Sequence, residues 1–268
     1  LKKKSNPSRM KTNTFISWNV NGLRAVAKKD FLGWLKLGQY DLVALQEVKV
    51  FDLSVLTPEL RAPQNYTSYW HAAARPGYSG VAIYAKEKPA VIKIDFGPAT
   101  ILSAEGRMIE LDFGDFIFLN IYFPNGKASL ERLKYKLEFY EAFLKYIKGR
   151  RREGRSVIFC GDVNTAHRAI DLARPKENEK ISGFLPQERA WLDRVIEAGF
   201  IDTFRLFHSE PNQYSWWDLK SRARERNVGW RIDYFFTSDD LSSRLTEAFI
   251  LPAVIGSDHC PIGLTIKR

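Results

Sequence analysis

The stretch Gly256-Ser257-Asp258-His259-Cys260-Pro261 adjoins the last predicted strand, and its polar residues decide the fold prediction. Four other apolar runs also stop abruptly at carboxylates or carboxamides. These stops are Ser17-Trp18-Asn19-Val20-Asn21, Leu45-Gln46-Glu47, Gly161-Asp162-Val163-Asn164 and Trp230-Arg231-Ile232-Asp233. If each run is a buried strand, its terminal polar residues lie at one edge, where open α/β sheets usually bind ligands. The sequence therefore predicts an α/β fold with a polar site at one edge.

The predicted edge carries several oxygen donors and a single imidazole. Its members are Asn19, Glu47, Asp162, Asn164, Asp233, Asp258 and His259. A hard cation such as Mg²⁺ prefers oxygen ligands, whereas zinc favours more nitrogen or sulfur. The donor set therefore predicts a magnesium-type site, and such a site in a basic protein indicates phosphodiester hydrolysis.

The 268 residues include 41 Lys and Arg against 31 Asp and Glu, which gives a formal net charge of +10. This charge predicts a polyanionic partner, either nucleic acid or an anionic membrane. Aromatic and basic residues lie together in the stretch Tyr214-Ser215-Trp216-Trp217 and in Lys220, Arg222, Arg224 and Arg226, which follow it. This clustering favours a phosphate-rich partner, and a solvated cationic surface is the alternative.

The two cysteines, Cys160 and Cys260, adjoin polar motifs, and no secretory apolar region or long apolar segment precedes them. We expect an intracellular, soluble monomer with free buried thiols and no membrane association, and a disulfide between the two cysteines is the alternative. Residues 1–12 are charged and poor in apolar side chains, which predicts a disordered tail. No linker divides the remainder, so we expect one catalytic domain over residues 13–268.

Strand-like and helix-like patterns alternate along the chain, which predicts an α/β fold. Strands are expected at residues 14–18, 42–45, 80–85, 109–113, 116–122, 156–160, 232–237 and 262–267. Residues 130–148 repeat apolar side chains at steps of three and four, which predicts a helix capped by Ser129. A second helix is expected between Pro186 and Gly199.

Six stretches carry a family resemblance over nearly the whole chain from about Asn13 onward. They are WNVNGLRA (18–25), LQEVK (45–49), YFPNGK (122–127), GDVNTAH (161–167), NVGWRIDYF (227–235) and GSDHCPI (256–262). In this order they resemble the exonuclease III family of AP endonucleases, within the endonuclease/exonuclease/phosphatase superfamily. The resemblance implies a four-layered α/β sandwich, with two packed mixed β-sheets, helices outside and the site at one end.

The resemblance also implies an activity. A metal-dependent endonuclease is expected, which cuts the phosphodiester 5′ to an abasic site in double-stranded DNA and also has 3′→5′ exonuclease and 3′-end-cleaning activity. Glu47 matches the glutamate that binds Mg²⁺, or Mn²⁺ in its place, with Asn19 and Asp258 close by. Asp162 is expected to orient or deprotonate the attacking water, and Asn164 to donate to the phosphate.

Further roles follow from the same resemblance. Asp233 orients His259, which contacts the scissile phosphate, and Tyr122 holds the phosphate or the leaving oxygen. The positions that face DNA or its extruded nucleotide are Asn125, Lys127, Trp216, Lys220, Arg222, Trp230 and Ile232. The two tryptophans and the isoleucine of this set are expected to wall a pocket for a flipped-out abasic deoxyribose.

Several alternatives stay open from the residues alone. Asp162 and Asn164 are two apart, so an extended backbone would direct them the same way, whereas Gly-Asp-x-Asn also suits an Asx turn. Glu47 can equally form an ordinary salt bridge. The rival functions are a phosphatase acting on phosphoinositides or sphingomyelin, and a DNA-binding protein without catalysis. The basic surface and Ala169 motivate the second rival, and Ala169 stands where relatives commonly carry glutamate.

Overall fold

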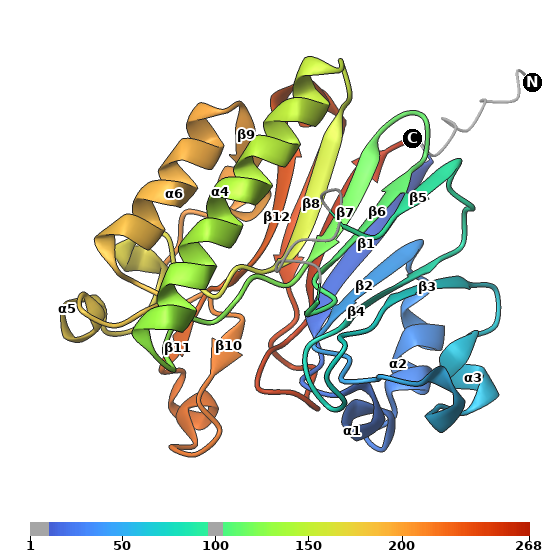
Figure 1. The fold of residues 1–268 in the computed structure, drawn as a ribbon, viewed down its shortest axis with the longest axis horizontal. Helices are drawn as coiled ribbons and strands as arrows, with labels where there is room; N and C mark the ends of the chain where they lie inside the picture. The colour runs from blue at the N-terminus through green and yellow to red at the C-terminus, as the bar shows by residue number, and fades with distance from the viewer. Residues whose placement is uncertain (1–10, 96–103) are drawn as a thin grey trace, which may run out of the picture.

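The computed structural model describes residues 11–95 and 104–268. Two six-stranded β-sheets pack face to face within these residues, and helices cover both outer faces (Figure 1). The expected four-layered sandwich of two mixed sheets is therefore confirmed. Residues 1–10 of the expected tail lie outside the described residues, whereas Thr12 already begins the first strand.

The first sheet has the strand order β13-β14-β1-β2-β4-β3. Its strands are β1 (Thr12–Asn19), β2 (Leu42–Gln46), β3 (Thr67–His71), β4 (Val81–Ala85), β13 (Leu245–Ile250) and β14 (Ile262–Lys267). β1 and β2 are parallel, and Asn19 pairs with Gln46 at their ends. The carboxyl ends of these two strands therefore lie side by side.

The second sheet has the strand order β5-β6-β7-β8-β12-β9. Its strands are β5 (Val91–Lys93), β6 (Met108–Asp112), β7 (Ile117–Ile121), β8 (Val157–Asp162), β9 (Phe200–Asp202) and β12 (Asp233–Ser238). β7 and β8 are parallel, whereas β12 runs antiparallel to β8 with Asp233 opposite Asp162. A separate ribbon of β10 (Trp216–Trp217) and β11 (Gly229–Trp230) lies below the sheets in Figure 1.

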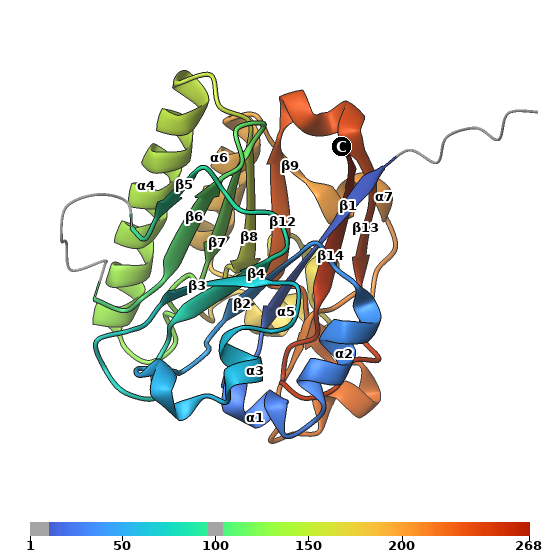
Figure 2. The same ribbon diagram turned by 90° about the vertical axis from the view of Figure 1, so that its right-hand side faces the viewer.

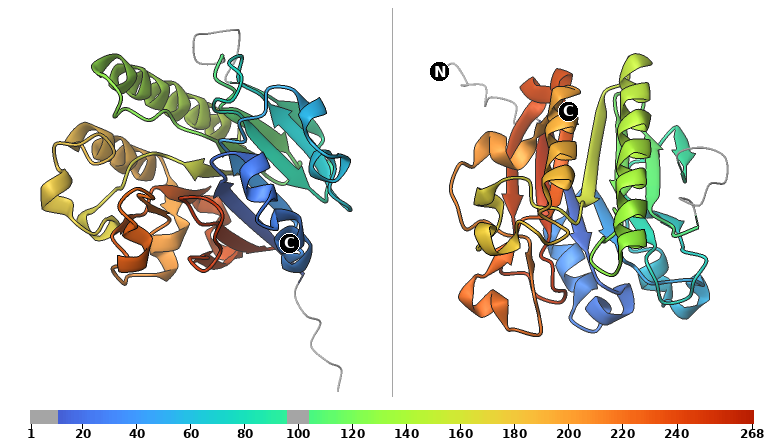
Figure 3. Two further views of the ribbon diagram at one scale, coloured as in Figure 1. Left: turned by 90° about the horizontal axis from the view of Figure 1, so that it is seen from below. Right: turned by 60° about the vertical axis from the view of Figure 1, so that its left-hand side comes forward.

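Helices form the two outer layers. α1 (Leu23–Ala27), α2 (Phe31–Gly38) and α3 (Pro58–Arg61) cover the first sheet, and α4 (Leu130–Arg152) and α6 (Pro186–Glu197) cover the second (Figures 2 and 3). The shorter elements are α5 (Pro175–Asn178), α7 (Thr203–Phe207) and the 3-10 turns η1 (Leu53–Val55), η2 (Ala169–Asp171), η3 (Ala223–Arg226) and η4 (Asp239–Arg244). None of the described helices is long and apolar enough to cross a bilayer.

Three apolar layers separate the four layers of structure. Between the sheets, Phe15 of β1 meets Phe118 of β7 edge to face, with ring centroids 5.4 Å apart. Under the outer helices of the second sheet, Trp191 of α6 stacks on Tyr140 of α4 at 4.1 Å. Burying one large apolar side chain stabilises the fold by roughly 2–3 kcal/mol, so these layers supply the main driving force.

The predicted strands and helices are present, and the strands of the two sheets that the sequence did not predict lie at the sheet edges. All eight predicted strands form, α4 continues four residues beyond 148, and the Ser129 hydroxyl accepts from the Arg132 amide at 3.2 Å. The predictions missed the short ribbon β10–β11 and also β3, β5, β9 and β13, which are the four sheet edges. Edge strands carry fewer buried apolar residues, so tertiary pairing decides them. Both cysteines are buried and free, so the disulfide alternative is wrong.

A buried polar contact joins the two sheets. The Gln46 side-chain amide of β2 donates to Asn120 Oδ1 of β7 at 2.7 Å. The Asn120 amide in turn donates to the carbonyls of Leu45 and Ala82, at 3.0 and 2.8 Å. Because buried polar groups are costly without partners, these bonds favour one relative placement of the sheets near the ends of β1 and β2.

A buried ion cluster fixes the segment that leads into β12. Arg231 is fully buried and donates to Asp171 Oδ1 at 2.8 Å and to Asp202 Oδ2 at 2.7 Å. Arg205 adds a second contact to Asp171 at 2.6 Å. Burial raises the pKa of Asp171, but the two arginines outweigh it and lower the pKa to about 2. The Asp171 carboxylate is therefore charged and binds Arg231, which directly precedes Ile232.

Replacing Asp171 by asparagine removes one partner of this cluster, and we expect a loss of about 3 kcal/mol in the free energy of unfolding at pH 7. The folded-state pKa lies below the unfolded value. The carboxylate therefore stabilises the fold above about pH 4, and this contribution is lost as the pH falls toward about 2. Urea unfolding followed by circular dichroism at pH 7 and from pH 4 to 2 measures both effects.

Asp115→Asn is the matched control, because Asp115 is 68% exposed and pairs with Arg244 on the surface. We expect it to cost less than about 1 kcal/mol. A stability difference between wild type and Asp171→Asn that stays constant from pH 7 to pH 2 would contradict the assignment of this charge.

Candidate active site

Strand ends from both sheets bring the predicted polar residues to one edge. β1 ends at Asn19, Glu47 follows β2, and β8 ends at Asp162. Asp233 begins β12, and His259 precedes β14. Because β12 and β14 run antiparallel to β8 and β1, their starting ends reach the same edge as the carboxyl ends of those strands.

The amide of Asn19 joins the two sheets at this edge. Its Nδ2 lies 2.9 Å from Glu47 Oε1 in the first sheet and 2.9 Å from Asp162 Oδ2 in the second. Its Oδ1 accepts from the backbone amide of Asn21 at 3.0 Å. The fully buried Asn19 thus holds two carboxylates close together and satisfies its own hydrogen bonds.

A glycine allows Asp162 to reach its position. Gly161 has φ +143°, and a Cβ built there would lie 1.8 Å from the Ile121 carbonyl oxygen of β7. Any larger residue would push β8 away from β7 immediately before the carboxylate. The Gly-Asp order in the sequence is therefore a steric requirement of the site.

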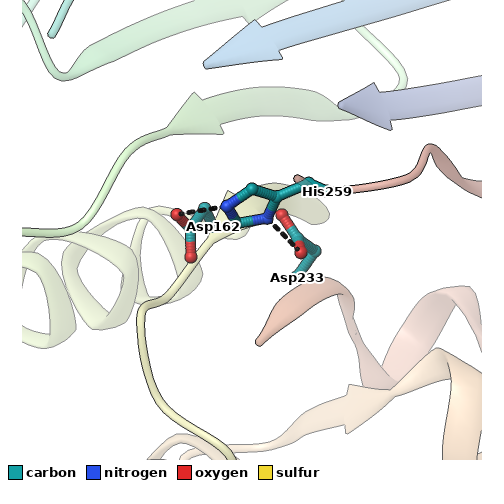
Figure 4. A group of neighbouring side chains, drawn as sticks. All are labelled: Asp162, Asp233 and His259. Carbon is teal, nitrogen blue, oxygen red and sulfur yellow. Dashed lines mark hydrogen bonds and ion pairs between the residues drawn. The ribbon is translucent and has the colours of Figure 1, made fainter. Parts of the chain in front are cut away.

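Asp162, Asp233 and His259 form a compact buried group (Figure 4). His259 Nδ1 lies 2.9 Å from Asp233 Oδ2, and Nε2 lies 3.8 Å from Asp162 Oδ2. The Ser215 hydroxyl donates to Asp233 Oδ2 at 2.6 Å. Burial lowers the pKa of His259, but the charges of Asp233 and Asp162 outweigh it and raise the pKa to about 10. At neutral pH the imidazole is therefore a cation that can donate to an anion.

Asp162 and Asn164 lie together, but not through an extended backbone. β8 ends at Asp162 and Asn164 is left-handed with φ 55°, so of the two alternatives the extended backbone is wrong. The Asn164 backbone amide donates to Asp162 Oδ1 at 2.8 Å, as in an Asx turn, and both residues line one pocket. Burial raises the pKa of Asp162 and His259 opposes it, while Asp233 and Glu47 add to the rise, which brings it to about 7.

A buried ion pair anchors the Asn164 loop. Lys136 of α4 and Glu188 of α6 are both fully buried, with Nζ and Oε1 2.6 Å apart. The same ammonium donates to the Asn164 carbonyl at 2.7 Å, and Glu188 Oε2 accepts from the Gly183 amide at 2.6 Å. The ion pair therefore fixes Asn164 and Gly183 on two sides of one pocket.

Glu47 and Asp258 complete the oxygen-rich side of the site. Lys49 Nζ lies 3.2 Å from Glu47 Oε2, so the salt bridge considered as an alternative is present. Asp258 accepts from Asn21 Nδ2 at 2.9 Å and from Trp216 Nε1 at 3.0 Å. Glu47 and Asp258 line the same pocket as Asp162. Three carboxylates around one pocket fit a hard divalent cation by charge and donor chemistry.

The pocket itself is small, with a volume of about 170 Å³, against roughly 300–1,000 Å³ for typical small-molecule pockets. Its walls are Glu47, Asn125, Lys127, Asp162, Asn164, Gly183, Trp216, Trp230, Ile232, Asp258 and His259. The two tryptophan rings meet edge to face with centroids 6.4 Å apart. The pocket is therefore polar on one side and aromatic on the other.

Five of the predicted site residues do not line the pocket. Asn19, Asp233 and Tyr122 are buried beside it, and the Arg107 guanidinium lies 4.5 Å from the centre of the Tyr122 ring. Burial and the charge of Glu47 raise the pKa of Tyr122 well above its ordinary value. Lys220 and Arg222 are exposed on the loop after β10, where Arg222 pairs with Glu225 at 2.8 Å.

The predictions missed several residues that support the site. Asn21 and Lys49 lie inside the quoted motifs, but neither ends an apolar run as Asn19 and Glu47 do. Ser215, Arg107 and the Lys136–Glu188 pair carry no local signal, because their partners are distant in sequence. Ala169, by contrast, is exposed in η2 and does not line the pocket.

Known proteins share both the sequence and the fold. The model of the Endonuclease/Exonuclease/phosphatase family matches residues 16–259. An exodeoxyribonuclease of Bacillus subtilis is 44% identical over 254 residues, which cover 94% of this chain and 98% of that protein. The DNA repair nuclease APEX1 of Danio rerio is 38% identical over 92% of this chain and 80% of its own.

The solved structures agree with these relatives. The crystal structure of the AP endonuclease LMAP from Leishmania major superposes with a TM-score of 0.87 at 28% identity. The match covers 100% of this chain and 92% of that one.

Gly161→Ala tests the steric requirement at the end of β8. We expect a loss of about 3 kcal/mol or more in the free energy of unfolding, because the new Cβ meets a backbone oxygen that cannot move alone. Gly149→Ala is the matched control, since Gly149 lies in α4 and a Cβ built there has nothing within 4 Å, and it should gain about 1 kcal/mol. Urea unfolding compares the two, and equal effects would contradict the close approach.

Proposed function

Because this chain belongs to the endonuclease/exonuclease/phosphatase family and resembles its exonuclease III-type members, we propose that it hydrolyses the phosphodiester 5′ to an abasic site in duplex DNA. We also propose 3′→5′ exonuclease and 3′-end-cleaning activity, which need the same hydrolytic group. The names of the relatives support a nuclease over a lipid phosphatase.

The observation that carries the proposal is the direct contact between the aromatic and polar sides of one small pocket. Trp216 donates from its indole nitrogen to Asp258, so the aromatic wall is tied to the acidic site. A pocket of about 170 Å³ between these two sides can receive a bare sugar. Extruding a nucleotide without a base also costs less than extruding an intact one.

The buried group supplies the proton chemistry. With its pKa near neutrality, Asp162 is suited to accept a proton from an attacking water. The imidazolium of His259 and the amide of Asn164 line the same pocket, and both are proposed to donate to phosphate oxygens. Asn164 would do so in exchange for its present contacts with the Phe123 carbonyl and Asp162. Asp233 keeps His259 charged and oriented through its contact to Nδ1. Tyr122 interacts with Glu47 from its buried position beside the pocket, and we propose that its hydroxyl holds the phosphate or the leaving oxygen.

Glu47 is the residue that we propose as the ligand of a divalent cation, Mg²⁺ or Mn²⁺. The Asn19 amide donates to Glu47 and thereby orients it, and Asp258 faces the same pocket. When bound, such an ion supplies Lewis-acid stabilisation of negative charge on phosphate oxygens. The cation would also offset the repulsion among the three carboxylates.

Basic and polar residues around the pocket are suited to the DNA backbone. Asn125 and Lys127 lie on the turn after β7, and Lys220 and Arg222 lie on the exposed loop after β10. Contacts between such residues and phosphates position the duplex without reading its sequence. Salt should therefore weaken the binding of this chain to DNA.

Gel mapping of cleavage tests the proposed function. Duplexes that contain one abasic site or only normal bases are incubated with and without Mg²⁺, beside vesicles that contain phosphoinositide or sphingomyelin. We expect Mg²⁺-dependent incision that leaves a 3′ hydroxyl 5′ to the abasic site. Turnover of the lipids without incision of DNA would establish the phosphatase alternative instead.

The variants Glu47→Gln and Asp162→Asn test two proposed roles separately, that of the cation ligand and that of the proton acceptor. Each change keeps the shape and removes a charge, so we expect incision to fall at least about a hundredfold while duplex binding persists. A raised Mg²⁺ concentration should partly restore the incision rate of Glu47→Gln and leave that of Asp162→Asn unchanged. Single-turnover incision and fluorescence anisotropy measure the two properties.

Glu138→Gln is the control for these charge changes, because Glu138 is 56% exposed on α4. It should change neither incision nor binding. Equal rescue of both site variants by Mg²⁺ would contradict the division of roles between Glu47 and Asp162.

Asp233 and His259 should behave as one unit. We expect the double variant Asp233→Ala/His259→Ala to lose far less activity than the product of the two single losses, since either change already breaks the pair. A double-mutant cycle on kcat measures this coupling. Multiplicative losses would show that the two residues act independently.

A further inference from the structure

Lys127 places a primary amine within the candidate pocket. Its ammonium nitrogen lies 5.2 Å from the ring centre of Trp216 and 5.0 Å from that of Trp230. Among the described residues, no carboxylate lies within 4.0 Å of this nitrogen in a salt bridge. The amine therefore lies over aromatic faces and makes no direct salt bridge with a described carboxylate.

The turn after β7 fixes the base of this side chain. Asn125 Oδ1 accepts from the Lys127 backbone amide at 2.8 Å, and Asn125 Nδ2 donates to Asn164 Oδ1 at 2.9 Å. The turn that carries the amine is thus tied to the loop that carries a proposed phosphate donor. Lys127 as a whole residue is exposed, whereas its ammonium nitrogen lies over the rings of Trp216 and Trp230.

The two sides of the pocket suit different parts of an abasic nucleotide. Its polar side, with Asp162, Asn164 and His259, suits the phosphate, and its aromatic side suits the sugar carbon that has lost its base. That carbon, C1′, is an aldehyde in the ring-opened form of an abasic deoxyribose. An amine among aromatic rings beside an aldehyde meets the requirement for Schiff-base chemistry.

We propose that Lys127 forms an imine with C1′ of the ring-opened abasic sugar and so gives this protein a second, metal-independent strand-cleaving activity. The inference rests on the proposed function, because an abasic nucleotide must enter the pocket. It assigns Lys127 a covalent role in addition to its expected contact with DNA.

The reaction balances without any further reagent. The neutral amine adds to C1′, and the adduct takes up one proton from solvent and loses one water, which gives the protonated imine. Water then accepts a proton from C2′, the C3′–O bond breaks, and the 3′ phosphate leaves on the downstream strand. Hydrolysis of the remaining imine consumes one water and releases Lys127 and an unsaturated aldehyde at the 3′ end of the upstream strand.

The surroundings of Lys127 favour both stages of this reaction. Burial of the amine lowers its pKa from the ordinary value, which increases the neutral fraction that attacks an aldehyde. The rings of Trp216 and Trp230 can also stabilise the cationic imine by the cation–π contact that they make with the ammonium.

Reductive trapping tests the proposal. The full chain is incubated in EDTA and cyanoborohydride with a duplex that contains an aldehydic abasic site, and covalent adducts are separated on a denaturing gel. We expect an adduct with the wild-type protein and a loss of at least about tenfold in Lys127→Arg, which keeps the charge but cannot form this imine. Peptide mapping of the wild-type adduct should place the deoxyribose on Lys127.

Two controls separate the covalent role from simple binding. A duplex with a tetrahydrofuran in place of the sugar has no aldehyde and should give no adduct. Lys134→Ala removes a lysine that is 80% exposed on α4, and it should form the adduct as the wild type does. Melting temperature and duplex affinity show whether Lys127→Arg remains folded and bound.

The outcomes separate this inference from the proposed function. No adduct in the wild type, an undiminished adduct in a folded Lys127→Arg, or an adduct mapped to another amine would each overturn the inference. Mg²⁺-dependent incision of the tetrahydrofuran duplex would still support the proposed function in those cases. An adduct on Lys127 without Mg²⁺-dependent incision would support only the covalent activity. If Lys127→Arg does not fold, peptide mapping of the wild-type adduct decides whether Lys127 forms the imine.

Discussion

The site depends on one buried amide that reaches both sheets. Asn19 ends a strand of the first sheet, yet its Nδ2 lies 2.9 Å from carboxylate oxygens of Glu47 and of Asp162, which belong to different sheets. Two buried carboxylates repel each other, and a shared donor offsets part of that repulsion. A second contact between the same sheets, from Gln46 to Asn120, involves the residue directly before Glu47. Face-to-face packing thus becomes a precise arrangement of acidic groups.

Buried charges hold the rest of the site in place. Lys136 and Glu188 fix the carbonyl of Asn164, and Arg231 with Asp171 fixes the segment before Asp233. A buried ion pair costs desolvation free energy, so its net contribution to stability is modest, whereas the loss of one partner is severe. These pairs therefore act chiefly by allowing few positions for the loop that carries Asn164 and for the segment that leads into Asp233.

The two sides of the pocket have different roles: the polar side suits the chemical reaction, and the aromatic side suits the selection of the bound nucleotide. Its polar side gathers Asp162, Asn164 and His259, and its aromatic side is formed by Trp216 and Trp230. The indole of Trp216 donates a hydrogen bond to Asp258, so a displacement of the aromatic side also displaces the acidic side. The Lys127 amine lies over both rings, at the aromatic side of the pocket.

The sequence by itself determined the class of fold, the eight inner strands of the two sheets, the two main helices and the edge at which Asn19, Glu47 and Asp162 meet. Apolar runs that stop at polar residues are local signals, and they sufficed for these elements. Only the tertiary structure decided the four edge strands, the left-handed Asn164, and the partners of Ser215, Arg107 and Lys136. Those features arise from contacts between residues far apart in the chain, and no local pattern encodes which distant groups will meet.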